Sequence, residues 1–266
     1  MDMTPQTSTL KVPGASLYYE MRGSGPVLLI IPGGPQDAGV FADVAGHLAD
    51  RYTVVAYDPR GNSRSTFDGE PQEQDLDVHG DDAARLIEAL GAGPAYVFGT
   101  SGGAQIGLNL AARHPGRVRA LVAHEPPSMM LLDDGVEAAM QKFFSENSLS
   151  EGPGQDEAGP QDGPPSFEPS PEEAETFARV SGNFEYWLAH GVMPLSLYRP
   201  DIEALRGRPV VVGIGEESVG QPIDGMGKAL ADRLGSKRAA FPGDHMGFAP
   251  YPDRFAETLH LTLRGA

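Results

Sequence analysis

Short apolar runs rich in β-branched residues alternate along this chain with segments of helical spacing. Such runs are typical of strands buried on both faces, and their alternation with helices indicates a mostly parallel, twisted sheet flanked by helices. We expect strands at residues 16–21, 26–31, 53–57, 95–98, 118–123, 209–213 and 238–241, and helices at 36–50, 76–90, 102–113 and 252–263. The sequence therefore predicts a single α/β core.

The alternation is interrupted between the strands at 118–123 and 209–213. We interpret residues 128–201 as a helical lid, or cap, inserted into a core that consists of residues 1–127 and 202–266. Within the lid, residues 148–171 are rich in Gly, Pro, Ser and acidic side chains, which bury too little apolar surface to offset the entropy of ordering. This stretch is expected to be a flexible acidic loop.

The net charge of the chain limits the classes of partner that it can bind. With 37 acidic and 20 basic residues the formal net charge is -17, and such a field repels phosphate backbones and anionic lipid surfaces. There is no cysteine, which excludes disulfides and thiolate metal sites. No signal segment and no run of roughly 20 apolar residues is seen. We expect a cytoplasmic protein with neither nucleic acid nor membrane as partner.

The segment Gly99-Thr100-Ser101-Gly102-Gly103 matches G-x-S-x-G. It lies between an expected strand and an expected helix, where a sharp, strained turn would lift the Ser101 hydroxyl above the sheet. Glycines at both ends would avoid collisions with the neighbouring strand and helix. An ordinary Gly-rich turn or a phosphate-binding turn would look similar, but the chain contains neither G-x-G-x-x-G nor G-x-x-x-x-G-K-[ST]. The pattern favours a nucleophilic serine.

Acyl transfer also needs amide donors for the developing oxyanion. The turn itself supplies the amide of Gly102, and the loop at residues 31–35 follows an expected strand and offers Gly34. A plain strand-to-helix turn would contain the same Gly and Pro residues, so this loop is compatible with both interpretations.

A serine nucleophile needs a base, and one of the seven histidines lies where a base is expected. His245 comes directly after the last expected strand, at the sheet edge where open α/β folds keep their sites. His124 is expected to be structural because strand alternation turns it away from Glu125. Surface or capping roles are expected for the remaining five: His47, His79, His114, His190 and His260.

Together, the strand order, the serine turn, the Gly-Gly loop and the late histidine resemble the α/β-hydrolase family over nearly the whole chain. The resemblance implies an α/β-hydrolase fold with a lid after the sixth strand, and a triad in the order nucleophile, acid, histidine. The family's usual aspartate position, after the seventh strand, holds Ser218 here.

The acid is therefore sought elsewhere. A minority of the family places it after the sixth strand, where this chain has His124-Glu125-Pro126-Pro127. This segment is similar to the zearalenone lactone hydrolases, in which a Glu in a His-Glu-x-Pro segment completes the triad. The resemblance implies that Glu125 is the acid and that it orients His245. Glu216 and Glu217, one loop away, remain the alternative.

These residues predict a serine hydrolase that cleaves an apolar carboxylic ester or lactone through an acyl-enzyme, without metal or organic cofactor. A C–C bond hydrolase or perhydrolase with the same triad, and a receptor-like protein of slow turnover, remain alternatives. A homodimer is left open. The lid stretch at residues 183–191 resembles one in which a Trp of the zearalenone hydrolases stacks on the ligand, which implies Trp187 as a substrate contact. Further substrate contacts are expected from Gly33, Pro127, Met130, Tyr186 and Met246.

Overall fold

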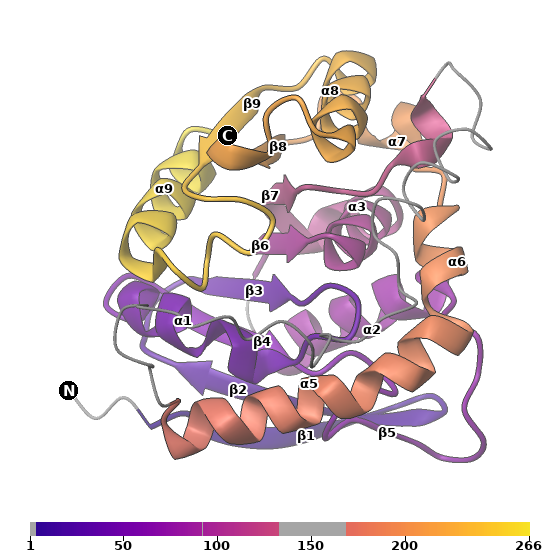
Figure 1. Cartoon of the computed structure of the whole chain (residues 1–266), viewed down its shortest axis with the longest axis vertical. Helices are drawn as coiled ribbons and strands as arrows, with labels where there is room; N and C mark the ends of the chain where they lie inside the picture. Colours follow the sequence, from indigo (N-terminus) through magenta and orange to yellow (C-terminus); the bar gives the residue numbers. More distant parts are fainter. Residues whose placement is uncertain (1–3, 92, 133–168) are drawn as a thin grey trace, which may run out of the picture.

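The protein is built on one twisted sheet with helices on both faces (Figure 1). The computed structural model describes residues 4–91, 93–132 and 169–266. The sheet order is β1-β2-β4-β3-β6-β7-β8-β9, with β5 pairing with β2. The strands are β1 (Gln6–Val12), β2 (Ala15–Arg22), β3 (Val27–Ile31), β4 (Thr53–Tyr57), β5 (Thr66–Phe67), β6 (Ala95–Thr100), β7 (Val118–His124), β8 (Val210–Gly215) and β9 (Arg238–Phe241). From β4 to β9 all neighbours are parallel, whereas β1, β2 and β5 pair antiparallel at one end.

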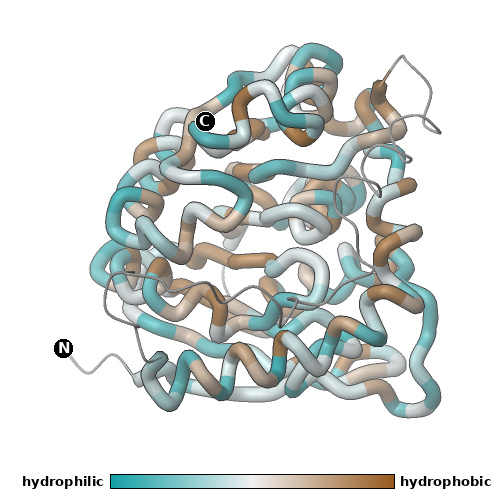
Figure 2. The backbone as a smooth tube through the Cα atoms, viewed as in Figure 1, coloured by the Kyte–Doolittle hydropathy of each residue, from teal (hydrophilic) through white to brown (hydrophobic). Residues whose placement is uncertain are grey.

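The strand β3 shows how the sequence fills both layers. Its five residues are all buried and alternate between two apolar clusters. Leu28 and Ile30 pack with α1 and α9 on one face, and Leu29 and Ile31 pack with α2, α3 and α8 on the other. Because successive side chains of a strand point to opposite faces, an uninterrupted apolar run is what a strand between two helical layers requires. Figure 2 shows the corresponding brown stretch along β3.

Four of the helices that cover the sheet, α1, α2, α3 and α9, agree closely with the expected ones, whereas α8 was not expected. The helices are α1 (Ala42–Leu48), α2 (Leu76–Ala89), α3 (Gly102–Arg113), α5 (Pro171–His190), α6 (Val192–Ser196), α7 (Ile202–Leu205), α8 (Pro222–Leu234) and α9 (Pro252–Arg264), with short 3₁₀ turns η1 (Ala38–Phe41), η2 (Pro115–Arg117), η3 (Met129–Leu131) and η4 (Glu216–Ser218). Gly91, with φ +66°, follows the last turn of α2 as expected.

The segment between β7 and β8 carries η3, α5, α6 and α7 in its described part. A capping box fixes the start of α5: the Ser170 hydroxyl accepts from the Glu173 amide, and the Glu173 carboxylate accepts from the Ser170 amide. The helix α5 runs along η1, and α6 lies beyond the carboxyl ends of β3 and β6 (Figure 1). The expected acidic loop at 148–171 lies outside the described residues up to residue 168.

The structure contradicts the expectation for one of the histidines. His79 was expected at the surface or at a cap, but it is fully buried inside α2, so this prediction was wrong. The spacing of helical residues alone did not show which face of α2 carries it. None of the helices in the described ranges combines the length and apolar content that crossing a bilayer requires.

Candidate active site

Ser101 occupies the turn between β6 and α3 in a strained backbone conformation. Its φ of +53° and ψ of -125° lie outside the regions that L-residues favour. The Ser101 amide donates to the His124 carbonyl at 2.9 Å, which ties the turn to the end of β7. The sharp, strained turn expected from the motif is therefore present.

The glycines at both ends of the motif are required by close approach. A Cβ on Gly99 would lie 2.3 Å from the Gly103 carbonyl oxygen, and one on Gly103 would lie 2.1 Å from the Ile31 carbonyl oxygen. Both contacts are shorter than any that real Cβ atoms tolerate, and both are with backbone. The predicted collisions with strand and helix are thus confirmed.

The loop after β3 packs directly on this turn. The Gly33 amide donates to Gln36 Oε1 at 3.1 Å, so among the described residues Gly34 is the neighbouring amide without an acceptor. A Cβ on Gly102, at the first position of α3, would lie 3.4 Å from the Gly34 nitrogen. The amides of Gly34 and Gly102 therefore lie close together beside Ser101, one of them at a helix N-terminus.

Glu125 and His245 are in contact. Glu125 follows β7 with φ +45° and is fully buried, and its Oε2 lies 2.6 Å from Nδ1 of His245. Its other oxygen, Oε1, accepts from the Gly215 amide at 2.8 Å. Glu216 and Glu217, the alternative acids, are both exposed to solvent.

The pKa of Glu125 shows the balance of forces on this carboxylate. Burial acts to raise it, but the hydrogen bond with His245, the adjacent His124 and the nearby Ser218 side chain act more strongly in the other direction. The net effect lowers the pKa of Glu125 to about 2. Glu125 is therefore ionised at neutral pH, as an acceptor for the imidazole proton must be.

His124 lies beneath the site and is structural, as alternation indicated. It is fully buried, with Nδ1 3.0 Å from Thr100 Oγ1 and its ring stacked on His245 at a centroid distance of 6.5 Å. Burial lowers the pKa of His124 to about 4. A neutral imidazole thus supports the second imidazole from below.

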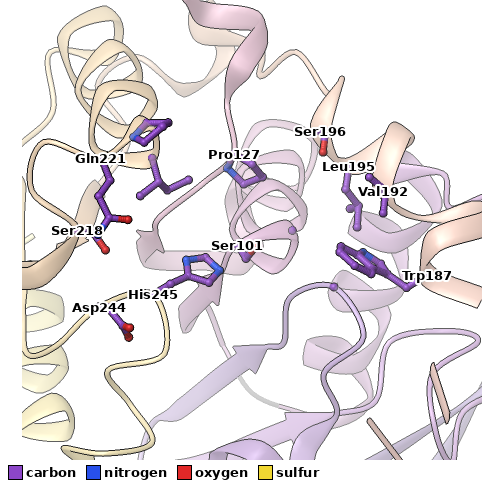
Figure 3. A pocket seen from close by; sticks show the side chains of 14 residues that line it. Ser101, Pro127, Trp187, Val192, Leu195, Ser196, Ser218, Gln221, Asp244 and His245 are labelled. Carbon is purple, nitrogen blue, oxygen red and sulfur yellow. The ribbon is translucent and has the colours of Figure 1, made fainter. Parts of the chain in front are cut away.

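A cavity of about 370 Å³ opens above Ser101 and His245 (Figure 3). On one side it is lined by Trp187, Val192, Leu195 and Ser196 from α5 and α6, and on the other by Ser218, Gln221, Pro222, Ile223 and Asp244; Gly34, Gly102 and Pro127 complete the wall. Of the residues in this wall, none is Lys or Arg. A neutral ligand with an apolar part fits such a lining better than an anion.

Two of the expected substrate contacts, Trp187 and Pro127, line the cavity, and four do not. Gly33 lies beneath it, where a Cβ would be 2.7 Å from Ser101 Cβ. Tyr186 points away and donates to the Gln72 carbonyl at 2.9 Å. Met246 is 41% exposed and its sulfur accepts from Gln36 Nε2 at 3.3 Å, and Met130 lies half-buried in η3.

The wall formed by η4 and the start of α8 was missed at the level of sequence. Ser218, Gln221, Pro222 and Ile223 directly follow β8. A usable signal was available, because residues after the carboxyl end of a parallel strand gather at the edge that holds Ser101.

The helix α5 is tied to the loops around the site. Asn183 Nδ2 donates to the Pro35 carbonyl and to Ser63 Oγ, both at 2.8 Å, and its Oδ1 accepts from the Ser63 amide at 2.7 Å. Arg179 Nε donates to the buried Asp37 Oδ2 at 2.7 Å. These bonds hold Trp187, which is on the same helix, over Gly34. A Cβ on Gly34 would lie only 3.3 Å from Cε2 of Trp187.

No group of three or more potential metal ligands gathers anywhere in the described part of the chain. The chemistry available at this edge of the sheet is that of a hydroxyl, an imidazole, a carboxylate and two amides.

Known proteins resemble the chain over nearly all of its length. Residues 26–162 match the alpha/beta hydrolase fold family. An uncharacterized hydrolase of Bacillus subtilis, YraK, is 37% identical, covering 98% of this chain and 97% of the relative. A zearalenone hydrolase of Bionectria ochroleuca is 28% identical over 97% of each chain. An enol-lactonase from Burkholderia xenovorans has a similar structure, with a TM-score of 0.67 at 16% identity, covering 97% of this chain and 100% of that one.

Proposed function

The chain belongs to the alpha/beta hydrolase fold family and is a hydrolase, and from this premise we propose that it cleaves a neutral carboxylic ester or lactone with Ser101 as nucleophile, His245 as base and Glu125 as acid. The observation that carries the proposal is the 2.6 Å contact of Glu125 with His245 Nδ1, at the wall of a cavity that also contains Ser101.

The proposed mechanism follows from the different partners of the two ring nitrogens of His245. Because Nδ1 of His245 is bonded to Glu125, Nε2 is the nitrogen left for the Ser101 hydroxyl. Ser101 Oγ attacks the carbonyl carbon while Nε2 takes its proton, and the negative oxygen accepts from the amides of Gly34 and Gly102. The oxyanion collapses as His245 returns the proton to the leaving alkoxide. A water activated by the same nitrogen then hydrolyses the acyl-enzyme.

The helices α5 and α6, in this proposal, form the described part of a lid over the cavity. They contribute Trp187, Val192 and Leu195 to its wall, an apolar and aromatic surface suited to the hydrocarbon part of a substrate. The acidic Asp244 and the net charge of -17 disfavour anionic substrates. The similarity to a zearalenone hydrolase over nearly the full chain supports a large lactone as one substrate to test.

The test is a panel of p-nitrophenyl esters, aliphatic lactones and resorcylic lactones, assayed with wild type and Ser101→Ala. We expect turnover of neutral esters or lactones by wild type and none above background by the variant. A fluorophosphonate probe should label wild type alone. Labelling without ester or lactone turnover would instead point to C–C bond hydrolysis or perhydrolysis, and absence of labelling to a binding protein.

A further inference from the structure

The part of the cavity wall formed by α6 contains a serine. Val192, Leu195 and Ser196 line the cavity, and their spacing of three and four residues puts them on one face of the helix. Met193 and Leu197 face outward and are 45% and 38% exposed. A serine thus lies on the buried face while two apolar residues face solvent, which the burial of apolar surface does not explain.

The hydroxyl of Ser196 lacks a protein partner. The residue is only 6% exposed, yet no donor or acceptor within the described residues meets its side chain, and the bond to a carbonyl one turn earlier, common for helical serines, is not formed there. A hydroxyl in a cavity wall is hydrated only as long as water occupies the cavity. A substrate that displaces this water must therefore supply a partner or leave the hydroxyl unpaired, at a cost in affinity.

The position of α6 indicates which part of a substrate meets Ser196. The neighbouring Leu195 packs on the serine turn, since a Cβ on Gly102 would lie 2.9 Å from its Cδ1. His245 lies on the other side of Ser101 from these residues (Figure 3). In the proposed mechanism the leaving alkoxide has to face Nε2 of His245. The acyl part is then the half of the substrate that extends toward α6.

We propose that Ser196 is a specificity-determining residue, which donates a hydrogen bond to an oxygen on the acyl part of the substrate. The preferred ester or lactone then has a carbonyl or hydroxyl oxygen within an otherwise apolar acyl chain. The proposal rests on the proposed function. Trp187, Val192 and Leu195 pack against the hydrocarbon around that oxygen, and the hydroxyl fixes its position along the chain.

The test uses four isomeric substrates, the p-nitrophenyl esters of octanoic acid with a keto group at the fourth, fifth, sixth or seventh carbon. The isomers have one composition and one leaving group, and a keto oxygen accepts a hydrogen bond without cyclising onto the ester as a hydroxyl could. With each rate divided by that of alkaline hydrolysis, we expect one isomer to exceed the others by about tenfold in kcat/KM, the effect of one hydrogen bond in a water-excluded site.

Ser196→Ala removes the hydroxyl with little change in shape. We expect kcat/KM for the favoured isomer to fall about tenfold, and that for unsubstituted p-nitrophenyl octanoate to rise about two- to threefold, because no hydroxyl is left unpaired beneath the chain. Ser196→Thr keeps the hydroxyl and should keep the favoured isomer. Leu197→Ala, at the exposed neighbouring position, is the matched control and should show the wild-type pattern.

Three results would overturn the role of Ser196. These are equal rates of wild type on all four isomers, a preference that survives in Ser196→Ala, and a loss in Ser196→Ala that is shared by the keto esters and octanoate, as a packing role would give. Circular dichroism checks the fold of each variant. If Ser196→Ala does not fold, Ser196→Cys replaces it, because a thiol has a similar shape and is a weak donor.

The failure of this proposal can be told from that of the proposed function. Wild type that hydrolyses none of the esters and does not react with the fluorophosphonate probe removes the proposed function itself. Wild type that hydrolyses octanoate and all four keto isomers without preference leaves the function standing and removes only the role of Ser196.

Discussion

Glu125 is buried and yet ionised, because the Gly215 amide of β8 binds one of its oxygens and His245 binds the other. The exposed Glu216 and Glu217 have no comparable set of donors among the described residues. What distinguishes the proposed triad acid from the neighbouring carboxylates is this environment, more than its distance along the chain.

At this scale the first prediction concerns the three proposed catalytic side chains. Ser101→Ala and His245→Ala should each lower kcat on the order of 10⁶-fold, and the double variant should be little worse, because the groups act as a unit. Glu125→Gln keeps the shape but not the charge and should cost roughly 10⁴-fold. Steady-state kinetics on a p-nitrophenyl ester measures all of these.

The matched control is Glu217→Gln, an exposed acid in the next loop. It should keep activity within about twofold of wild type. Near-normal activity of Glu125→Gln together with loss in Glu217→Gln would reverse the assignment of the acid.

Residue-level prediction from sequence succeeded where a local rule applied. The glycines around Ser101 follow from sterics, and both predicted collisions are present. The positive φ of Glu125 was not predictable, since no turn motif marks it. Likewise, a period of hydrophobicity shows that a residue lies in a helix, but the depth of His79 depends on which elements pack against it.

Among the elements, α5 links the cavity to the loops below it. Asn183 and Arg179 bond to loops near the site, and Trp187 on the same helix forms part of the cavity wall. In Figure 2 the helix alternates between teal and brown, in keeping with its two environments. Its position is thus set by polar bonds from the middle of the helix and by the packing of Trp187 near its C-terminal end.

The second prediction tests this wall. Trp187→Ala should raise KM roughly tenfold for bulky aromatic esters or lactones, because it removes a large stacking surface, and should spare a short p-nitrophenyl ester. Leu188→Ala, at an exposed position on the same helix, should change neither value. Equal changes for large and small substrates would contradict a stacking role for Trp187.

The strands and helices themselves were largely foreseen, since β4, β9 and α3 have the expected ends and most others differ by a few residues. Outside the lid, β1, β5, α7 and α8 were missed, and two of these show why. The strand β1 is mostly exposed and polar, as an edge strand can be, and α8 begins after a turn in which Gly and Pro obscure the helical period. In both cases the neighbouring β2 or the sheet face, not the local sequence, determines the structure.

For the molecule as a whole, the two buried histidines make the free energy of unfolding depend on pH. Neither ring nitrogen of His79 has a partner among the described residues, and burial with nearby Arg60 lowers its pKa to about 3. In the unfolded chain a histidine takes up its proton near pH 6.5, whereas folded His79 and His124 stay neutral down to about pH 3 and pH 4. The free energy of unfolding therefore has its full value above pH 6.5 and decreases as the pH falls toward 4 and 3. Each shift corresponds to roughly 3 kcal/mol or more.

The third prediction follows from this sign. Between pH 7 and pH 5 the melting temperature of wild type should fall, and that of His79→Leu should fall less, by about 4 °C. Differential scanning calorimetry at the two pH values measures the difference. The exposed His47, changed to Gln, provides the control and should fall as wild type does. A slope that is the same in all three proteins would assign the acid sensitivity to other groups.

The positive φ of Ser101 implies that the serine is held in its turn at some loss of folding stability. Glycine would relax that backbone and alanine would not, although either abolishes the nucleophile. Ser101→Gly should therefore melt roughly 2–5 °C above Ser101→Ala in calorimetry, and identical melting points would mean that the turn stores no tension. A homologue no longer selected for turnover would therefore gain thermal stability from glycine at this single position.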